Sequence, residues 1–440
     1  MRKLFEWLRH VIVTVLAFLV TGMFALLALN LSFLSSIAQV VKDFEMTDIY
    51  YQILQDTDEA EVDEEVTIVD MSALYSRREL AATLCDIEAQ GPKVVGVDVV
   101  FEGLKEDTVG DEMMRQVATE YGNIVYSYKL IDYENDSTGY ADAVHSFFAS
   151  DGTNEGFTNM QRNLYGGMKR QLSLGQRCQG RVVPSFITQV VNGSGIEKPL
   201  AAEERELNIN FTPRRFQVVE PEDVGLQPEW ITGKVVLFGA MKEEQDMHYT
   251  PLGKMAGVEL LAYSVATLLE RSEVWLPGGW LTGLMSFLLV LLTEVLSFKY
   301  KSFAKERRNR LLRFVMSMSF VWSVLLFVWM SFWVWVAFIL FCKYGVSLNL
   351  GYALTAIAML ALAESIYSEC ETAIKERNNG KKSIDAGLCL GSLVCRQSSD
   401  GTDEDKSLPS VCRHRVGAWR AQEPSLRLCY RPWRTVLGNA

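Results

Sequence analysis

Three aspartates have the residue type and the spacing best suited to binding chemistry. Asp70 ends a run of β-branched residues, Asp98 lies near the end of a second such run, and Asp246 follows a third. In parallel α/β sheets the binding crevice lies outside the carboxyl ends of the strands. Three carboxylates that converge on this edge favour a cation or a ligand with an amine or hydroxyl group, and they raise the pKa of at least one member.

A structural role is the alternative for two of these residues. Short carboxylates commonly accept hydrogen bonds from backbone N–H groups in turns, and this interpretation applies to Asp70 and Asp98. The sequence leaves both interpretations open. We predict Asp70, Asp98 and Asp246 as ligand-binding residues, and we predict no catalytic residue, no metal ligand and no cofactor.

Common catalytic motifs are absent from the sequence. No Gly-Lys pair has the glycine spacing of a P-loop, and neither G-x-S-x-G nor H-E-x-x-H occurs. With 4 histidines in the chain, a His-based metal site is not expected. The acid-rich stretch 56–65 lacks the glycine of an EF-hand and predicts a solvated loop. Cys85 and Cys178 either form a disulfide in an oxidising compartment or remain thiols, with Cys85 buried in a helix.

The segments that carry the first two aspartates alternate between strands and helices. A strand at 65–70 leads to a helix that begins with the capping-box pattern Ser76-Arg77-Arg78-Glu79, and Gly91-Pro92 ends that helix. A strand at 93–101, a helix at 110–121 and a strand at 123–131 follow. This order predicts an α/β fold with a mainly parallel sheet.

The rest of this domain is less regular, and residues 132–181 carry no assignable pattern beyond loops and short strands. Farther along, a helix is predicted at 182–191 and a long helix at 257–271, with strands between them near 207–211, 216–220 and 233–239.

Charge divides the chain into an acidic middle and basic, apolar ends. The whole chain has a net charge of −11, whereas residues 41–275 alone carry −21 and the remainder carries +10. The first apolar run, 11–36, is long enough to cross a membrane, as are three later runs. A cleaved signal peptide is the alternative for the first run, because Ser36-Ile37-Ala38 resembles a cleavage site. Its length favours an uncleaved anchor.

The loop between the second and third apolar runs predicts the orientation. It carries one acid, Glu306, against the bases Lys299, Lys301, Lys305, Arg307, Arg308, Arg310 and Arg313. Cytoplasmic loops are enriched in Lys and Arg, so this loop is predicted to be cytoplasmic. The basic N-terminus and the even number of predicted spans support the same orientation. Both termini are therefore predicted to lie in the cytoplasm and residues 41–275 outside it.

The predicted organisation has seven parts. These are a cytoplasmic N-terminus (1–10), transmembrane helix 1 (11–36), an extracytoplasmic α/β domain (40–275), transmembrane helices 2 (280–298), 3 (314–341) and 4 (346–367), and a disordered cytoplasmic tail (368–440). Glu294 and Glu364 fall inside apolar runs, and intramembrane carboxylates often mark function. Both lie near the cytoplasmic ends of their spans, so we expect them to reach water or the basic loop.

Several segments resemble the type-2 CHASE domain family, an extracytoplasmic sensory module of bacterial membrane receptors. The most specific one is 231–262, with Ile-Thr-Gly-Lys-Val-Val-Leu-Phe-Gly, then Asp246, Thr250-Pro251 and Met-Ala-Gly-Val-Glu at 255–259. The opening of the family resembles Val-Thr-Ile-Val-Asp at 66–70 and Gly-Val-Asp-Val-Val-Phe at 96–101. The three predicted spans directly after the domain also resemble the arrangement in this family. The resemblance implies an α/β sensor in the bacterial inner membrane and supplies no ligand, although the three aspartates match its signature positions.

The chain departs from receptor members of this family after its last span. Those members continue into a kinase, cyclase or phosphodiesterase, whereas residues 368–440 are too few for such a domain and carry none of their motifs. The leading hypothesis is a membrane sensor without catalytic output, embedded in the lipid bilayer, which binds an unknown small ligand or ion and acts through an unknown protein partner. A membrane-anchored scaffold and an envelope enzyme are the alternatives, and no nucleic-acid partner is expected.

Overall fold

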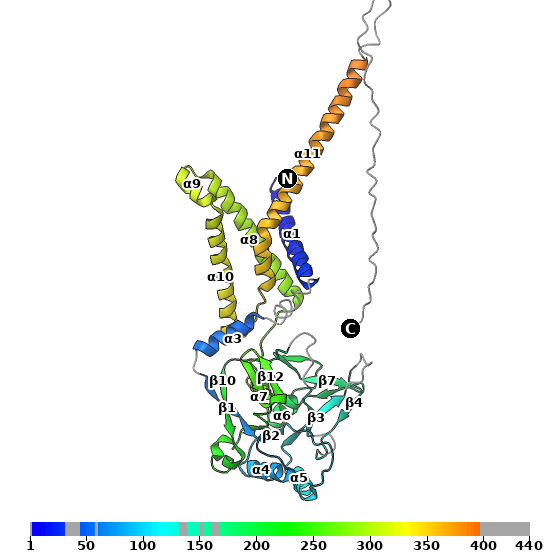
Figure 1. Ribbon diagram of the computed structural model, residues 1–440, viewed down its shortest axis with the longest axis vertical. Coiled ribbons are helices and arrows are strands. Elements are labelled where there is room, and N and C mark those ends of the chain that lie inside the picture. The colour runs from blue at the N-terminus through cyan, green and yellow to red at the C-terminus, as the bar shows by residue number, and fades with distance from the viewer. Residues whose placement is uncertain are drawn as a thin grey trace, which may run out of the picture. The chain divides into compact units, whose positions relative to one another are not determined.

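The protein combines an α/β domain with long apolar helices, as the computed structural model in Figure 1 shows. The structure describes residues 2–30, 45–57, 60–131, 139–149, 154–159 and 167–396. The possible cleavage site at Ser36 and the stretch 132–138 lie outside the described residues. Residues 45–275 are called the α/β domain below. Both parts of the predicted fold class are confirmed.

A seven-stranded sheet is the centre of the α/β domain. Its strands, in spatial order, are β10 (Arg214–Val219), β1 (Glu61–Asp70), β11 (Val235–Gly239), β2 (Val94–Val97), β3 (Ile124–Ile131) and β4 (Asp142–Val144), with β5 (Glu155–Phe157) also paired to β3. All pairs are parallel except the β3–β4 pair. The two strands β11 and β2 are short apolar runs because both faces of a parallel sheet are covered.

Alternation along the strands divides the core into two layers. On β1, Val66 and Ile68 face one layer and Val69 faces the other. On the neighbouring β11, Val235 and Leu237 join the first layer, and Val236 and Phe238 join the second. This two-residue period is the intrinsic geometry of a strand, so the residues at the ends of β1, β11 and β2 are in phase with one another.

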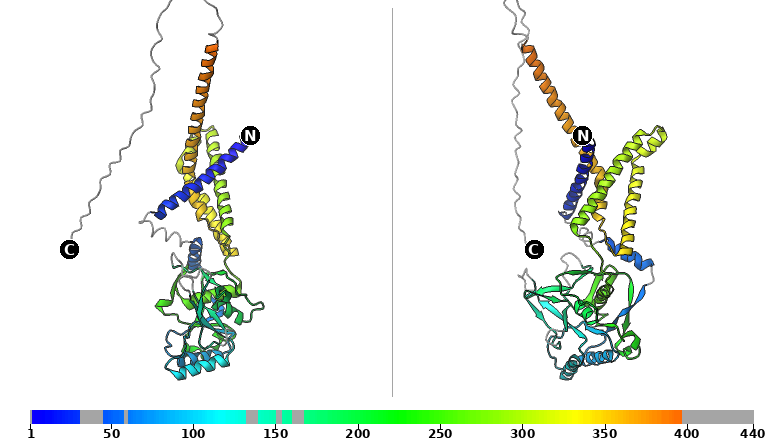
Figure 2. Two further views of the ribbon diagram at one scale, coloured as in Figure 1. Left: turned by 90° about the vertical axis from the view of Figure 1, so that its right-hand side faces the viewer. Right: turned by 180° about the vertical axis from the view of Figure 1, so that it is seen from behind.

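Two pairs of helices cover the sheet. Helices α4 (Arg77–Ala89) and α5 (Thr108–Glu120) pack on one face, and α6 (Phe186–Gly193) and α7 (Gly257–Glu270) pack on the other. The predicted capping box is present, because the Ser76 side chain accepts from the Glu79 N–H and the Glu79 side chain accepts from the Ser76 N–H. Both views of Figure 2 show α4 and α5 on the side away from the apolar helices.

Short antiparallel pairs complete the domain. They are β6 (Gln171–Ser173) with β9 (Glu206–Asn208), β7 (Gly175–Cys178) with β8 (Arg181–Pro184), and β12 (Met247–Thr250) with β13 (Gly253–Ala256). The helix predicted at 182–191 starts later than expected. Pro184 ends β8, and Ser185 then caps α6 by accepting a hydrogen bond from the N–H of Thr188 at 3.4 Å.

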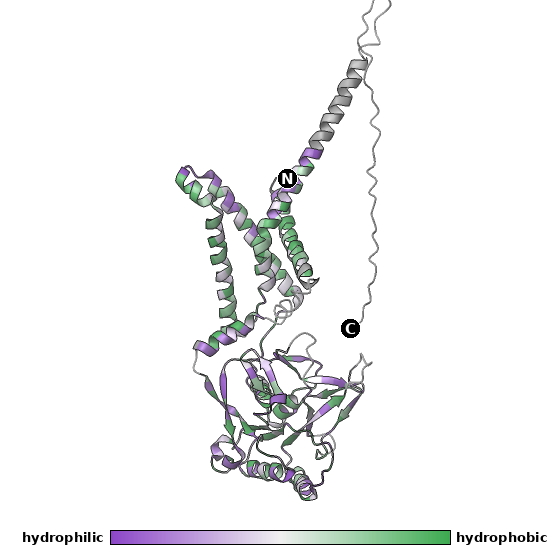
Figure 3. Cartoon of the chain, viewed as in Figure 1, coloured by the Kyte–Doolittle hydropathy of each residue, from purple (hydrophilic) through white to green (hydrophobic). Residues whose placement is uncertain are grey.

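Four helices of the described chain are long and apolar enough to cross a membrane. They lie in α1 (Arg2–Asn30), α8 (Gly279–Glu306), α10 (Ser319–Tyr344) and α11 (Gly351–Arg396), and Figure 3 shows their hydrophobic character. A further short helix, α3 (Met46–Thr57), leads from the first span into the domain. One continuous core extends from the α6 and α7 face of the sheet to residues of the apolar helices, including Phe341 and Ala353.

The helix bounds in the structure differ from those of the predicted spans. The run 314–341 is not one helix, because α9 (Arg310–Ser317) is separate and α10 begins only at Ser319. Helix α9 carries Arg310 and Arg313 among apolar residues, so it is amphipathic rather than part of a span. Helix α11 continues to Arg396, so residues 368–396 are helical where a disordered tail is predicted. Residues 397–440 lie outside the described part of the chain.

Candidate functional site

Asp70 and Asp98 lie at the same edge of the sheet and on the same face. Asp70 is the last residue of β1 and pairs with Gly239 at the end of β11. On the other side of β11, the backbone N–H of Asp98 donates to the carbonyl of Phe238 at 2.9 Å. The strand period places both side chains on the α6 and α7 face. Gly239 lies between them and adds no side chain, and a β-carbon there would be 3.4 Å from that of Asp98.

Asp246 lies against the first turn of α7. It ends the short 3-10 helix η4 (Glu244–Asp246). Its carboxylate is so close to Gly257, the first residue of α7, that a β-carbon at Gly257 would overlap it. The residue before this helix, Ala256, offers no side-chain cap. A carboxylate at this position is favourable because the N-terminus of a helix carries a partial positive charge.

Asp98 and Asp246 interact electrostatically. Loss of solvation, followed by the negative charge of Asp246, raises the pKa of Asp98 to about 7, although Lys129 and His248 act in the opposite direction. The Nε2 atom of His248 is 3.4 Å from Oδ1 of Asp246. The rise in pKa predicted for at least one carboxylate is therefore found at Asp98. This pair, with His248 beside it, is called the acid pair below.

Asp70 has a different environment, and the structural interpretation applies to it. Its buried carboxylate accepts hydrogen bonds from the N–H groups of Ser72 at 2.9 Å and Met241 at 3.1 Å, and it forms an ion pair with Lys242 at 2.9 Å. Burial alone would raise the pKa of Asp70, but the hydrogen bonds from Ser72, Lys242 and Met241 outweigh burial and lower it. Asp98, in contrast, accepts no backbone hydrogen bond from any described residue.

Three residues near the carboxylates were not predicted from the sequence: His248, Lys129 and Lys242. His248 is two residues after Asp246 on β12, and this spacing was the one available signal. The other two approach the carboxylates only through the fold, so no local pattern indicates them. In the described part of the chain no three His, Cys, Asp or Glu side chains are grouped closely enough to hold a metal ion. Cys85 and Cys178 are both free thiols.

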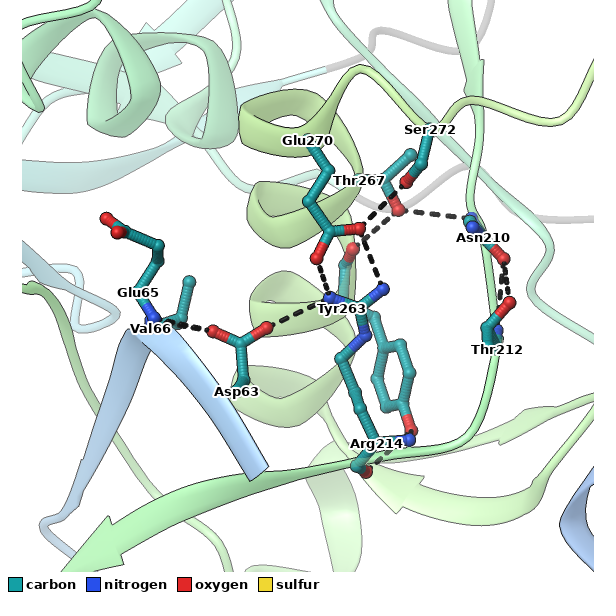
Figure 4. A network of polar contacts seen from close by, with 10 residues as sticks. All are labelled: Asp63, Glu65, Val66, Asn210, Thr212, Arg214, Tyr263, Thr267, Glu270 and Ser272. Atoms are coloured by element: carbon teal, nitrogen blue, oxygen red, sulfur yellow. Dashed lines mark hydrogen bonds and ion pairs between the residues drawn. The ribbon is translucent and has the colours of Figure 1, made fainter. Parts of the chain in front are cut away.

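At the other end of α7, an ion-pair network that is only partly buried joins the helix to the sheet (Figure 4). Arg214, the first residue of β10, binds Asp63 of β1 at 2.9 Å and Glu270, the last residue of α7, at 2.5 Å and 3.0 Å. Burial opposes the charge of Arg214, but its hydrogen bonds to Glu270 and Asp63 prevail and raise its pKa. Tyr263 donates to the Arg214 carbonyl at 3.1 Å. We call Arg214, Asp63 and Glu270 the junction triad.

The segment after α7 is bonded both to the domain and to the loop between the last two apolar helices. Glu273 accepts from Arg205 at 2.7 Å and from the N–H of Asn208 at 3.2 Å. Trp275 then donates its N–H to the carbonyl of Gly345 at 2.9 Å and accepts from the N–H of Ser347 at 3.1 Å. The chain that enters α8 is therefore held by backbone hydrogen bonds to the α10–α11 connection.

Aromatic contacts through α3 add a second connection. The ring of Tyr50 lies 5.4 Å from that of Phe338 and 5.3 Å from that of Phe341, both on α10. Tyr51 contacts Phe341 edge-on at 5.0 Å and Phe211 of the α/β domain at 5.9 Å. Edge-on and tilted packing of this kind is favourable beyond the apolar area that it buries. Phe341 thus lies at the boundary between the domain and the apolar helices.

The two carboxylates inside the apolar helices differ in their contacts. Glu364 of α11 forms an ion pair with Lys301, as expected for a residue near the basic loop. Glu294 of α8 does not reach water, and this expectation is wrong: its side chain is 0% exposed, and its Oε1 atom lies 3.1 Å from Nδ1 of His10 and 3.6 Å from a guanidinium nitrogen of Arg9. An apolar environment requires such pairing, because an isolated buried charge is costly. Glu294 therefore holds α1 against α8.

These features define a membrane-attached α/β domain that lies between one apolar helix and a further group of them. A sequence model of the CHASE2 domain matches residues 11–295, from the first apolar helix into α8. The chain belongs to the CHASE2 domain family, which is a sensory and non-catalytic family. The resemblance noted in the sequence is confirmed. Neither the curated proteins nor the solved structures contain a significant match to this chain.

The acid pair predicts a pH-dependent gain in stability for Asp98→Asn. Folding raises the pKa of Asp98 from an ordinary value of about 3.9 to about 7, so the native state of the parent loses stability as pH rises between these values. Asparagine does not ionise. At pH 8 the variant should be more stable than the parent by up to about 4 kcal/mol, and the difference should shrink on acidification towards pH 4.

Asp70→Asn is the matched control, because it makes the same chemical change at the same edge of the sheet. The pKa of Asp70 is lowered, so its stabilising contribution is present above the unfolded pKa and is lost as pH falls. This variant should be less stable than the parent at pH 8. Thermal unfolding of the full-length chain in nanodiscs measures both. If Asp98→Asn lowers stability at pH 8 as well, the acid pair is not as described.

Proposed function

We propose that the protein is a membrane sensor in which the acid pair responds to a ligand or a proton and α7 carries the response to the apolar helices. One observation supports this most directly. A single helix has Asp246 against its first turn and Glu270, a member of the junction triad, as its last residue. At 1.5 Å per residue, its 14 residues span about 20 Å.

The chemistry of the acid pair indicates the class of ligand. Two neighbouring carboxylates, one with its pKa raised to about 7, are in a strained electrostatic state when both are ionised. A proton, a cation or an amine relieves the repulsion, and a hydroxyl group donates a hydrogen bond to the ionised member. Asp70 is already bound by Lys242 and supports the loop after β11 instead. We therefore propose Asp98 and Asp246 as the ligand-binding residues, with Asp70 in a supporting role.

The response has a physical path to the membrane. A shift or tilt of α7 moves Glu270, and the junction triad transmits this movement to the first residues of β1 and β10. The same shift displaces Trp275, which is hydrogen-bonded to the α10–α11 connection. Because packed interfaces have discrete arrangements rather than continuous ones, a small displacement is sufficient to change how the helices pack.

We propose that the signal passes to a partner protein, which recognises the rearranged helices. The family is sensory and the sequence carries no catalytic signature. A membrane-anchored scaffold is the second candidate. The two differ in one respect: a sensor binds a ligand at the acid pair, whereas a scaffold requires none.

The orientation proposed here places both termini in the cytoplasm of a bacterium and residues 41–275 outside its inner membrane. Seven bases in the 299–313 segment and the basic start of the chain support it, because basic residues flank spans on the cytoplasmic side. Four helices of the described chain meet the length requirement, and an even number of crossings supports an orientation with both ends on the same side.

A ligand screen tests the proposed function. The full-length chain in nanodiscs should show a higher melting temperature with at least one member of a panel of envelope ions, amines and polyols, because a ligand that binds only the native state stabilises it. The shift should disappear in Asp246→Asn and persist in Asp142→Asn, an exposed control on β4. A shift that survives in Asp246→Asn places the ligand elsewhere, and no shift with any compound favours the scaffold.

Cysteine labelling in intact cells tests the orientation. On a background without native cysteines, Tyr75→Cys at an exposed turn of the α/β domain should react with a membrane-impermeant maleimide. Arg308→Cys, in the exposed connection between α8 and α9, should react only after the cells are permeabilised. The reverse pattern would overturn the proposed orientation, and reaction at both positions in intact cells would contradict the membrane crossings themselves.

A further inference from the structure

A cavity between the apolar helices lies at the end that carries the basic loop. Its volume is about 810 Å³, and its walls come from α8, α9, α10 and α11. The cavity is partly open to the surroundings of the helices, and pockets for organic ligands measure about 300–1,000 Å³. The cavity therefore has the size of a binding site for an organic molecule.

The wall of the cavity is polar at one end and apolar at the other. Lys301, Lys305 and Arg313 contribute cations, while Leu326, Ile357 and Leu360 contribute apolar surface. Lys301 is neutralised by its ion pair with Glu364. Lys305 and Arg313 have no acidic partner within ion-pair distance among the described residues. The cavity thus presents two uncompensated positive charges next to hydrocarbon.

Aromatic residues mark the level of the membrane surface at this site. The ring of Trp322 on α10 lies 5.0 Å from that of Tyr300 on α8, and the Tyr300 hydroxyl donates to the carbonyl of Met316 at 3.0 Å. Both aromatic residues line the cavity. Trp and Tyr are enriched where headgroups meet hydrocarbon, so the charged end of the cavity coincides with the headgroup level and the apolar end with the acyl chains.

We propose that this cavity binds an anionic phospholipid, with its phosphate between Lys305 and Arg313 and its acyl chains along Leu326, Ile357 and Leu360. Charge complementarity is the argument for this occupant, because basic pockets between spans suit anionic headgroups. Only about 11% of the apolar window of α10 is buried, so protein covers little of the surface of this helix. A lipid in the cavity supplies contacts between α10 and the other helices.

Three variants test the lipid site in the full-length chain. Lys305→Gln/Arg313→Gln removes the two uncompensated charges. Arg308→Gln/Arg310→Gln is the matched control, since it removes the same charge from the same segment at residues that do not line the cavity. Ala361→Trp keeps every charge and fills the apolar end, where Ala361 forms part of the wall.

The measurement is binding of phosphatidylglycerol to delipidated protein in a non-ionic detergent, read by native mass spectrometry and by thermal stabilisation. Phosphatidylcholine and glycerol 3-phosphate serve as comparison ligands. The parent and Arg308→Gln/Arg310→Gln should bind phosphatidylglycerol in preference to both. Loss of two cations should weaken binding roughly thirtyfold in Lys305→Gln/Arg313→Gln, and Ala361→Trp should also bind more weakly.

Each alternative occupant gives a distinct result that would overturn the proposal. Equal binding of phosphatidylcholine would indicate nonselective surrounding lipid, and equal protection by glycerol 3-phosphate would indicate a site for a soluble anion. An equal loss in Arg308→Gln/Arg310→Gln would assign the effect to the overall charge of the loop. Dimerisation of the parent that Ala361→Trp abolishes would mean that a second copy of the chain covers this face. These results do not depend on the proposed sensing function.

Discussion

The position of one buried guanidinium constrains how the α/β domain meets the membrane. Arg214 is the first residue of β10, and its two carboxylate partners belong to β1 and to the end of α7. Removing Asp63 would leave a desolvated charge, and breaking a buried ion pair of this kind typically costs about 3–5 kcal/mol, whereas the pair with the half-exposed Glu270 contributes less. The pairing therefore fixes the end of α7 against the entry of the sheet. The segment that continues to Trp275 and α8 starts from this fixed point, and so does the contact with the α10–α11 connection.

Much of the fold follows from local patterns in the sequence, and the exceptions have identifiable causes. The βαβαβ order from residue 65 to 131 was predictable, because β-branched runs alternate with a capped helix and with turn residues. The start of α6 was misplaced, since Val182 and Val183 fit a strand and a helix equally well and only the strand pairing of β8 decides between them. The break between α9 and α10 was missed because Phe314 and Val315 continue the apolar composition of the span. The amino-acid composition of this segment does not indicate that the helix is interrupted at Met318.

The candidate site was predicted in part, for similar reasons. The shared edge of Asp70 and Asp98 follows from the strand period and from the parallel order of the sheet, both of which the sequence indicates. The opposite pKa shifts of the two aspartates do not follow from the sequence. They depend on Lys242 and Ser72 beside Asp70, and on Asp246 beside Asp98. Glu294 was misjudged because its partner, His10, lies on a different helix. Long-range pairing between charged residues leaves no periodic signal in one sequence, whereas burial of apolar faces does.

The central claim is that the acid pair and the membrane-proximal junction are coupled through α7, and hydrogen exchange in nanodiscs tests it most directly. Acidification from pH 8 to pH 5.5 protonates Asp98, whose pKa is about 7, without requiring an identified ligand. After correction for the intrinsic pH dependence of exchange, the account predicts that exchange changes in residues 267–276 and in α3, with a midpoint near pH 7 that Asp98→Asn abolishes. A change confined to the loops beside Asp98 and Asp246, with the junction unaffected, would contradict the coupling.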